Sequence, residues 1–406
     1  MQENLHRKSR TTMSLHSTSA PFEAAPGSQT SLRVANQRRV IDAMRALGTT
    51  TQATIARETA LAPSTVSSIV HEMVTAGVLA MDSSHGGRRG QLVRFSDNAG
   101  FVVGLDVGHR HLTVAVADLN QDIKARQRFD LPRGHSVTEA LDTADSTLDA
   151  MVRKLKIPRV KLLAAGLTVP APVDLEGRVV SAGAILPAWA DTDVRAAASG
   201  RLGLPVAVEN DANAGAVGEF SQGAGRTAQN MAYIKVSHGV GAGLILNGRL
   251  FRGATGSAGE LGHMTLDEQG DVCRCGNRGC LETFISSEAV LTLLGATRGP
   301  DLTVAQVVDA ALAGDVGCAR VIGDTGRTLG TTVANLCNLI NPELVVVGGE
   351  LARAGDLLLA PLREIVSRYG VQGCTRDLAI TAAELGPEAH LTGALIMALE
   401  NVSLTV

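Results

Sequence analysis

FVVGLDVGHRHLTVAVADL, residues 101–119, reads as an apolar strand, a glycine-containing turn and a second apolar strand. NMAYIKVSHGVGAGLILNG, residues 230–248, repeats this pattern, and mixed helices and strands follow each copy. A pattern that occurs twice in this way predicts a duplicated α/β lobe. Because ligands bind in clefts between lobes, we expect a binding cleft where the two copies meet.

The composition argues against a fibrous or wholly disordered protein. The 406 residues are 45% hydrophobic and 2% aromatic, which indicates two or three globular domains with aliphatic cores. Residues 1–30 are polar and rich in Ser, Thr and Pro, so we expect a flexible tail rather than a signal peptide. No stretch reaches the roughly 18 apolar residues that a membrane span needs, and we therefore expect a cytoplasmic protein with no membrane partner.

Charge is distributed unevenly along the chain. Residues 1–95 contain 11 Lys and Arg against 6 Asp and Glu, whereas the remainder contains 26 against 34. A basic segment joined to an acidic remainder is a weak indication that the first part binds nucleic acid.

Residues 31–96 are predicted to form a winged helix-turn-helix domain. NQRRVIDAMRAL, residues 36–47, predicts a helix with one apolar face, formed by Val40, Ile41, Met44 and Leu47. TQATIARETALAPSTVSSIVHEMVTAGVL, residues 51–79, follows as a helix, a tight turn and a second helix, which opens at Pro63 and closes at Gly77. The residues predicted to form the buried face of that second helix are Val66, Ile69, Val70, Met73 and Gly77.

The opposite face of the second helix carries short side chains that approach phosphates and base edges closely in a recognition helix. The candidate DNA contacts on this face are Ser64, Thr65, Ser67, Ser68 and His71. SSHGGRRGQLVRF, residues 83–95, then reads as a wing whose glycine-rich tip presents Arg88 and Arg89 to the DNA. These features together favour binding of double-stranded DNA, and the alternative is a small helical docking module with a solvated polar face.

A compact group of metal-ligand residues lies in GHMTLDEQGDVCRCGNRGCLE, residues 262–282. In a reducing compartment, a CxC pair with a third cysteine five residues later favours thiolate ligation over a disulfide. The Cys3His set that structural Zn²⁺ favours is supplied by His263, Cys273, Cys275 and Cys280. The alternative is a cluster of reduced, buried cysteines. The cysteines predicted only to pack in the core are Cys318, Cys337 and Cys374.

Four segments together resemble the ROK family of sugar kinases and sugar-responsive repressors: GRVVSAGAILPAW, ENDANAGAVGEF, GSAGELGHM and CRCGNRGCLE. The resemblance covers approximately residues 98–400, and a winged helix-turn-helix in front is typical of the repressor branch. It implies an α/β, actin-like and hexokinase-like fold of two ribonuclease-H-type lobes. We expect the first lobe at residues 97–212 and the second, with the zinc loop, at residues 213–406. The C-terminal helix is expected to pack back on the first lobe.

The resemblance also implies a sugar site. The family's sugar-binding groups fall on Asn210, Asp211, Glu260, His263 and Glu282. Carboxylates and an amide suit this role because sugar hydroxyls both donate and accept hydrogen bonds. We hypothesise that zinc is a clamp that positions His263 and Glu282 for the sugar. The alternative is a zinc knuckle that only staples its loop.

The phosphate-binding turns depart from those of the family's kinases. The kinases use the aspartate that matches Asp211 as a general base, and their two turns read Asp-x-Gly-Gly-Thr-Lys and Gly-Thr-Gly. Here the first turn is DVGHRH, from Asp106 to His111, and the second is SHG, from Ser237 to Gly239. Bulky rings would keep the backbone N–H groups from wrapping phosphates, so we expect no kinase activity and only a vestigial base in Asp211.

The sequence therefore predicts a sugar-responsive transcriptional regulator, most simply a repressor, of carbohydrate uptake or metabolism genes. Its expected partners are operator DNA and a sugar or sugar-phosphate effector, and paired recognition helices imply a homodimer or homotetramer. The alternatives are an ATP-dependent hexose or N-acetylhexosamine kinase and a sugar-binding scaffold without a DNA partner. The single tryptophan, Trp189, ends a segment that the resemblance places beside the sugar. There its fluorescence would report sugar binding, whereas in the core it would not.

Overall fold

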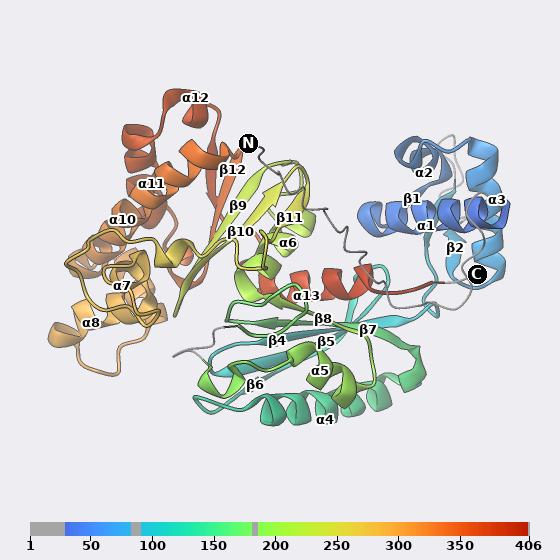
Figure 1. Ribbon diagram of the computed structural model, residues 1–406, viewed down its shortest axis with the longest axis horizontal. Helices are drawn as coiled ribbons and strands as arrows, with labels where there is room; N and C mark the ends of the chain where they lie inside the picture. The colour runs from blue at the N-terminus through green and yellow to red at the C-terminus, as the bar shows by residue number, and fades with distance from the viewer. Residues whose placement is uncertain (1–28, 83–90, 181–185, 405–406) are drawn as a thin grey trace, which may run out of the picture.

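The N-terminal module consists of three helices and a small sheet (Figure 1). The computed structural model describes residues 29–82, 91–180 and 186–404. The module's helices are α1 (Gln29–Leu47), α2 (Gln52–Thr59) and α3 (Pro63–Thr75), and its strands are β1 (Thr50–Thr51), β2 (Leu79–Asp82) and β3 (Leu92–Phe95). Helices α2 and α3 form the predicted helix-turn-helix, and the antiparallel strand β2 precedes the predicted wing while β3 lies at its end. The wing residues Arg88 and Arg89 lie outside the described residues.

Local sequence signals set the packing of these helices. Helix α3 begins at Pro63, and the chain turns away from it at Gly77, where φ is +73°. The predicted buried face of α3 is confirmed for Val66, Ile69, Val70 and Met73, whereas Gly77 is exposed because it lies beyond the helix end. On α1, Val40, Ile41 and Met44 are buried as predicted. Leu47 is 37% exposed, so that part of the prediction is wrong: α1 ends there and the chain reverses at Gly48.

Two five-stranded sheets with the same strand order form the two lobes. The first has the order β6-β5-β4-β7-β8 and the second β11-β10-β9-β12-β13. In each, three antiparallel strands are extended by two parallel ones. The strands of the first sheet are β4 (Phe101–Val107), β5 (His111–Asp118), β6 (Ile123–Asp130), β7 (Leu162–Val169) and β8 (Val206–Asn210). Those of the second are β9 (Met231–Val236), β10 (Val240–Leu246), β11 (Arg249–Phe251), β12 (Leu344–Gly348) and β13 (Ala379–Ala382).

This duplication confirms the predicted two-lobed α/β fold. The repeated sequence pattern corresponds to β4–β5 in the first lobe and β9–β10 in the second. Strands β4 and β9 are central and almost wholly buried, which explains why they read as continuous apolar runs rather than as alternating strands.

Each sheet is followed by a helix that packs on the other sheet. Helix α6 (Asp211–Gln222) follows β8 but packs against β9 and β10, and α13 (Ala389–Glu400) follows β13 but packs against β4 and β7. The two helices also meet each other, with Gly393 against the carbonyl group of Ala214 and Gly218 against that of Ala389. A side chain at either glycine would overlap those oxygen atoms, so the contact depends on glycine. Figure 1 shows α13 between the two lobes.

The other helices cover the outer faces of the sheets (Figure 1). The first lobe carries α4 (Val137–Leu155) and α5 (Val194–Leu202). The second carries α7 (Leu281–Ile285), α8 (Ser287–Arg298), α9 (Val304–Leu312), α10 (Val316–Ile340), α11 (Asp356–Tyr369) and α12 (Gln372–Thr375). Within the described ranges, no helix combines the length and the apolarity that crossing a membrane requires.

The N-terminal module shares a buried core with the first lobe. A single apolar cluster joins side chains of α1, α2 and α3 to side chains of β4, β5 and α13. Polar contacts reinforce this junction: Asn120 accepts from the N–H of Phe95 at 2.9 Å and donates to its carbonyl group at 3.0 Å. Arg45 of α1 donates to the carbonyl group of Val402, just after α13. The module is therefore packed onto the lobes through a continuous interior.

Candidate ligand cleft and metal centre

The four predicted metal ligands converge on one point. His263 ends the short 3-10 turn Leu261–His263, Cys273 and Cys275 lie in the loop that follows, and Cys280 immediately precedes α7. Their donor atoms all lie within 4.8 Å of one another. The sulfur atoms of Cys275 and Cys280 are 3.7 Å apart, and Nδ1 of His263 is 3.5 Å from the sulfur of Cys273.

These spacings fit a tetrahedral zinc ion. Bonds of about 2.3 Å to sulfur and about 2.0–2.1 Å to nitrogen place two sulfurs about 3.8 Å apart and a nitrogen about 3.6 Å from a sulfur. Gly276 and Gly279, with φ of +95° and +55°, provide the tight turns that fold so short a loop. The predicted ligand set is confirmed, and the donor chemistry is that of a structural zinc site. Of the remaining cysteines, Cys318 and Cys337 are buried as predicted and Cys374 is half-buried.

Three carboxylates gather beside the metal site. Asp211 begins α6, Glu260 precedes the turn that carries His263, and Glu282 lies in the first turn of α7. Burial, together with the charges of Asp211 and Glu282, raises the pKa of Glu260 to about 7, and Arg274 acts in the opposite direction. The three predicted sugar-binding carboxylates, here called the carboxylate cluster, therefore lie near enough for the charges of Asp211 and Glu282 to act on Glu260.

The ring of His263 lies between the metal site and Glu260 of the carboxylate cluster. Its Nδ1 atom faces the sulfur of Cys273, and its Nε2 atom lies 3.7 Å from Oε2 of Glu260. One nitrogen thus faces the metal position while the other faces the carboxylate cluster. This is the orientation that the clamp hypothesis requires.

Two cations that the sequence reasoning missed lie among these carboxylates. Lys235 of β9 forms an ion pair with Asp211, and Arg274, between two zinc-site cysteines, forms one with Glu282. Glu282 also accepts a hydrogen bond from the N–H of Val240 at 2.9 Å. Lys235 could have been noticed as the single charge in the apolar run MAYIKV, whereas nothing in the sequence pairs Arg274 with Glu282.

Asn210 is engaged chiefly in holding α6. Its side-chain oxygen accepts from the N–H groups of Ala212 and Asn213 at 2.8 and 3.2 Å, which caps the helix. Its amide nitrogen donates to the carbonyl group of Ala171 at 3.1 Å. Most of its hydrogen-bonding capacity is therefore used within the fold, and its main effect is to orient the neighbouring Asp211.

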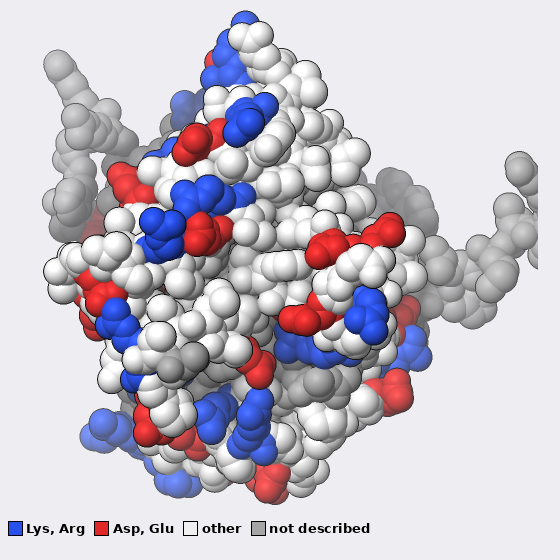
Figure 2. All heavy atoms as spheres, turned by 90° about the vertical axis from the view of Figure 1, so that its left-hand side faces the viewer, with Lys and Arg blue, Asp and Glu red and all other residues white. Residues whose placement is uncertain are grey.

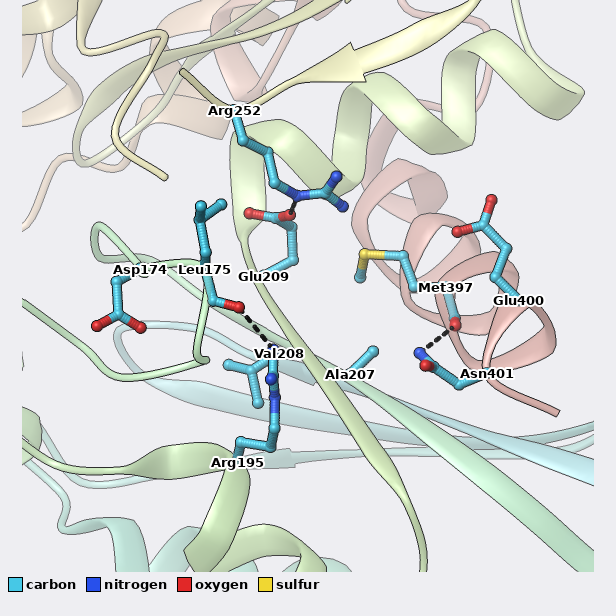
Figure 3. Close-up of a pocket in the computed structure, with 10 residues that line it drawn as sticks. All are labelled: Asp174, Leu175, Arg195, Ala207, Val208, Glu209, Arg252, Met397, Glu400 and Asn401. Carbon is cyan, nitrogen blue, oxygen red and sulfur yellow. Dashed lines mark hydrogen bonds and ion pairs between the residues drawn. The ribbon is translucent and has the colours of Figure 1, made fainter. Parts of the chain in front are cut away.

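A polar cavity of about 250 Å³ lies between β8 and the end of α13 (Figure 3). Glu209 bonds to Arg252 at 2.6 Å in this cavity, and it also accepts from the N–H of Asn210 and from the amide of Asn213. None of the five predicted sugar-binding residues lines it. Glu209 therefore ties the start of α6 to this cavity, which shares no lining residue with the carboxylate cluster.

The first turn is closed by a histidine rather than open to a phosphate. The buried carboxylate of Asp106 accepts from Thr168 at 2.9 Å and pairs with Nε2 of His111 at 3.0 Å. Burial alone would raise the pKa of Asp106, but His111, the charge of His390 and Thr168 outweigh it and hold the pKa well below its usual range. The two turns approach each other, and the rings of His109 and His238 lie 5.4 Å apart.

The predicted DNA contacts of α3 lie on its outer face. Ser64, Ser67, Ser68 and His71 are exposed and Thr65 is half-buried. Ser68 donates to Glu72 at 3.2 Å, and Glu72 in turn pairs with Arg33 of α1 at 2.7 Å. The negative charge of Glu72 is thus paired with Arg33 of the same module. The start of α3 is left with polar, uncharged side chains.

Trp189 lies in the core of the first lobe. Its side chain is completely buried, and its ring N–H donates to the carbonyl group of His135 at 3.0 Å. The structure bears out the alternative in which the ring lies in the core, because it fills the apolar cluster under α4 and α5. We expect its fluorescence to report unfolding rather than sugar contact.

The comparisons with known proteins agree with this architecture. The model of the ROK family matches residues 102–401. The xylose repressor of Bacillus subtilis (strain 168) is 30% identical over 90% of this chain and 95% of its own length. A glucokinase of Halalkalibacterium halodurans is 32% identical over 72% of this chain and 92% of its own length.

A solved structure described as a ROK family transcriptional regulator, homologue of the E. coli MLC protein, has a TM-score of 0.76 at 25% identity. It covers 91% of this chain and 96% of its own, so it includes the N-terminal module as well as both lobes. The family model spans more than half of the sequence and covers both sheets, the metal site and the carboxylate cluster. The chain belongs to the ROK family.

Proposed function

We propose that this protein is a sugar-responsive, DNA-binding transcriptional repressor of genes for carbohydrate uptake or metabolism. Residues 31–96 would bind operator DNA, and the lobes at 97–212 and 213–406 would bind the effector. The observation that carries this proposal is the shared core, because it joins a helix-turn-helix module to α13, which packs on the first sheet and on α6. A relative named as a repressor matches over 90% of the chain, whereas the glucokinase matches over 72%.

Operator DNA would contact α3. The side chains available there are the exposed hydroxyls and His71, with Arg88 and Arg89 of the wing as further candidates. Two copies of α3 can meet two half-sites only if the chain self-associates, so we propose a homodimer or homotetramer. The second lobe exposes apolar side chains suited to such contacts: Leu293, Leu312, Val316, Leu339, Tyr369 and Val371. Figure 2 shows this side of the molecule, where broad uncharged areas separate the charged groups.

The central experiment measures operator affinity while a panel of sugars is titrated against the protein and its own promoter fragment. We expect one sugar to weaken DNA binding, because it would bind the DNA-free form more tightly. By thermodynamic reciprocity, operator DNA should weaken sugar binding by the same factor. Fluorescence anisotropy and calorimetry measure the two factors independently.

Two aspartate variants serve as controls in that experiment. Asp211→Asn should lose the sugar response, whereas Asp301→Asn, an exposed loop residue, should respond like the parent. If Asp211→Asn lost DNA binding at an unchanged melting temperature, the proposed division of labour between module and lobes would be wrong.

Phosphoryl transfer is the competing function, and we expect the protein to lack it. Lys235 forms an ion pair with Asp211, the position of the kinases' general base, and His111 pairs with Asp106 in the first turn, so neither carboxylate is free for the role that it has in a kinase. A coupled assay of ADP release with the same sugar panel should give no turnover above the protein-free rate. Sugar-dependent ADP release that disappears in Asp211→Asn would establish a kinase instead.

A further inference from the structure

We propose that two glutamine side chains, Gln222 and Gln121, carry the state of the ligand cleft to Arg45 of the N-terminal module and so couple effector binding to operator binding. This inference rests on the proposed function and specifies how that function is regulated. It gives a role to side chains that belong neither to the carboxylate cluster nor to the outer face of α3. The hydrogen-bonded chain from Gln222 through Gln121 to Arg45 is here called the glutamine relay.

Helix α6 leads from the carboxylate cluster to the start of the glutamine relay. Asp211 is its first residue and Gln222 its last, and its 12 residues span about 18 Å. Although α6 follows β8 of the first sheet, it packs mainly on β9 and β10 of the second. Gln222 is therefore expected to move with the second lobe when the angle between the two lobes changes.

The relay crosses from α6 to the first lobe and then to the module. The side-chain amide of Gln222 donates to the side-chain oxygen of Gln121, which lies in the turn between β5 and β6. The amide nitrogen of Gln121 donates in turn to the backbone carbonyl group of Arg45 in α1, at 3.4 Å. A carbonyl group only accepts hydrogen bonds, so Gln121 must direct its NH2 group at Arg45 and its oxygen at Gln222. The relay therefore has one direction.

Arg45 is also held by the other helix that crosses between the sheets. Its guanidinium group donates to the carbonyl group of Val402, just after α13, and pairs with Asp42 at 3.2 Å. Only 16% of the Arg45 side chain is exposed. Arg45 thus meets α6 through the relay and α13 directly. Because α1 packs against α2 and α3, a relative shift of these two helix ends would act on the position of α3.

The backbone of Gln121 indicates that its side chain serves more than the turn. Its φ is +72°, in the left-handed region that glycine and asparagine adopt more easily than glutamine. The equivalent hairpin of the second lobe, β10–β11, places Gly248 at the same φ of +72°. Glutamine is therefore an unfavourable residue for this turn, and the relay supplies a reason for its presence.

The relay is sensitive to small movements. Hydrogen bonds between nitrogen and oxygen weaken beyond about 3.2 Å, and the bond from Gln121 to Arg45 is already longer than that. A shift of about 1 Å between Gln222 and the first lobe would break the chain. A sugar that changes the angle between the lobes would then favour one position of the module over another, which is the condition for a change in operator affinity.

The test measures how strongly a sugar changes operator affinity, with the full-length, zinc-loaded protein and its own promoter fragment. The probes are xylose, glucose, N-acetylglucosamine and N-acetylglucosamine 6-phosphate. The ratio of the operator Kd with sugar to that without sugar is the coupling factor, typically about 5 to 150. We expect variants of the relay to lower this factor toward 1 by about three- to tenfold, as the loss of one or two hydrogen bonds implies.

Three variants break different links of the relay. Gln121→Asn shortens the side chain at a φ that asparagine tolerates better, so the coupling factor should fall while the melting temperature stays the same or rises. Gln121→Glu and Gln222→Glu keep the size of the side chain but place a carboxylate, which cannot donate, where an N–H group is required. Each variant should still bind sugar alone and operator alone with a Kd within about fivefold of the parent's. The double variant Gln121→Asn/Gln222→Glu should lose no more coupling than either single change, because the links act in series.

Gln127→Glu is the matched control, because Gln127 is exposed on β6 and the change adds the same charge to the same hairpin. It should keep the parent's coupling factor. A parent-like coupling factor in both Gln121→Asn and Gln222→Glu would overturn this inference and leave the proposed function standing. A parent protein whose operator affinity none of the four probes changes would count against the proposed function itself.

Discussion

Cys275→Ser is expected to release zinc, to lower the melting temperature and to weaken sugar binding by about 10- to 100-fold, the scale typical of disturbed metal-site support. The metal loop carries Arg274 and ends at α7, so its loss would displace Glu282 as well as His263. Structural zinc contributes about 10–16 kcal/mol of binding energy in small zinc domains, which makes this one of the two largest effects that we predict.

The measurements for this variant are zinc content, thermal unfolding and sugar calorimetry. Cys374→Ser is the matched control, because Cys374 is half-buried and lies outside the metal site. It should retain zinc and bind sugar like the parent. Operator binding by Cys275→Ser should survive better than its sugar response, since the metal loop belongs to the second lobe. A zinc-free protein that binds sugar with the parent's affinity would show that the metal only staples its loop.

Gly393→Ala is expected to lower stability strongly, because the added methyl group would overlap the carbonyl oxygen of Ala214 in α6. Backbone atoms of a packed helix cannot rotate aside as a flexible side chain can, so α13 must shift away from α6. Overpacking of this kind costs about 1–3 kcal/mol and sometimes more. In a lobe of this size each kcal/mol lowers the melting temperature by about 2–4 °C.

Gly200→Ala provides the opposite expectation for the same chemical change. Gly200 lies within α5 and has open space around the position of an added side chain. Alanine there should stabilise the helix by up to about 1 kcal/mol. Urea unfolding compares the free energies of unfolding of the two variants. Operator affinity, measured with and without sugar, is a second property to compare. If Gly393→Ala were as stable as the parent, the close contact between α6 and α13 would be wrong.

The two lobes could be predicted from the sequence because each contains a strand-turn-strand pattern of apolar residues that are close together in the chain. The two apolar strand-turn-strand stretches became equivalent positions in two sheets of equal strand order. The exchange of α6 and α13 between the sheets could not be predicted in the same way. It depends on glycines such as Gly166 and Gly393, whose meaning appears only when another backbone approaches them. Glycine in a helix otherwise predicts only lower stability.

The metal site was predictable for the same reason as the lobes. Three of its four ligands lie within eight residues, and their spacing alone indicates a chelating loop. The ion pairs of Lys235 and Arg274 join residues 24 positions and eight positions apart across different elements, so no local pattern encodes them. The burial of Trp189 was left open because a single aromatic residue, here at the end of the 3-10 turn Pro187–Trp189, gives no sign of which face it will occupy.

The continuous interior between the N-terminal module and the lobes has a consequence for building hybrid regulators. A DNA-reading module that ends in a flexible linker can be exchanged between proteins by cutting at the linker. Here the apolar side chains of α1–α3 are complementary to those of β4, β5 and α13, and Asn120 and Val402 bind the module's backbone and Arg45. A chimera joined near residue 96 would inherit two surfaces shaped for different partners. Exchange of operator specificity therefore requires grafting the outer face of α3 alone, or transplanting the module together with the lobe surface on which it rests.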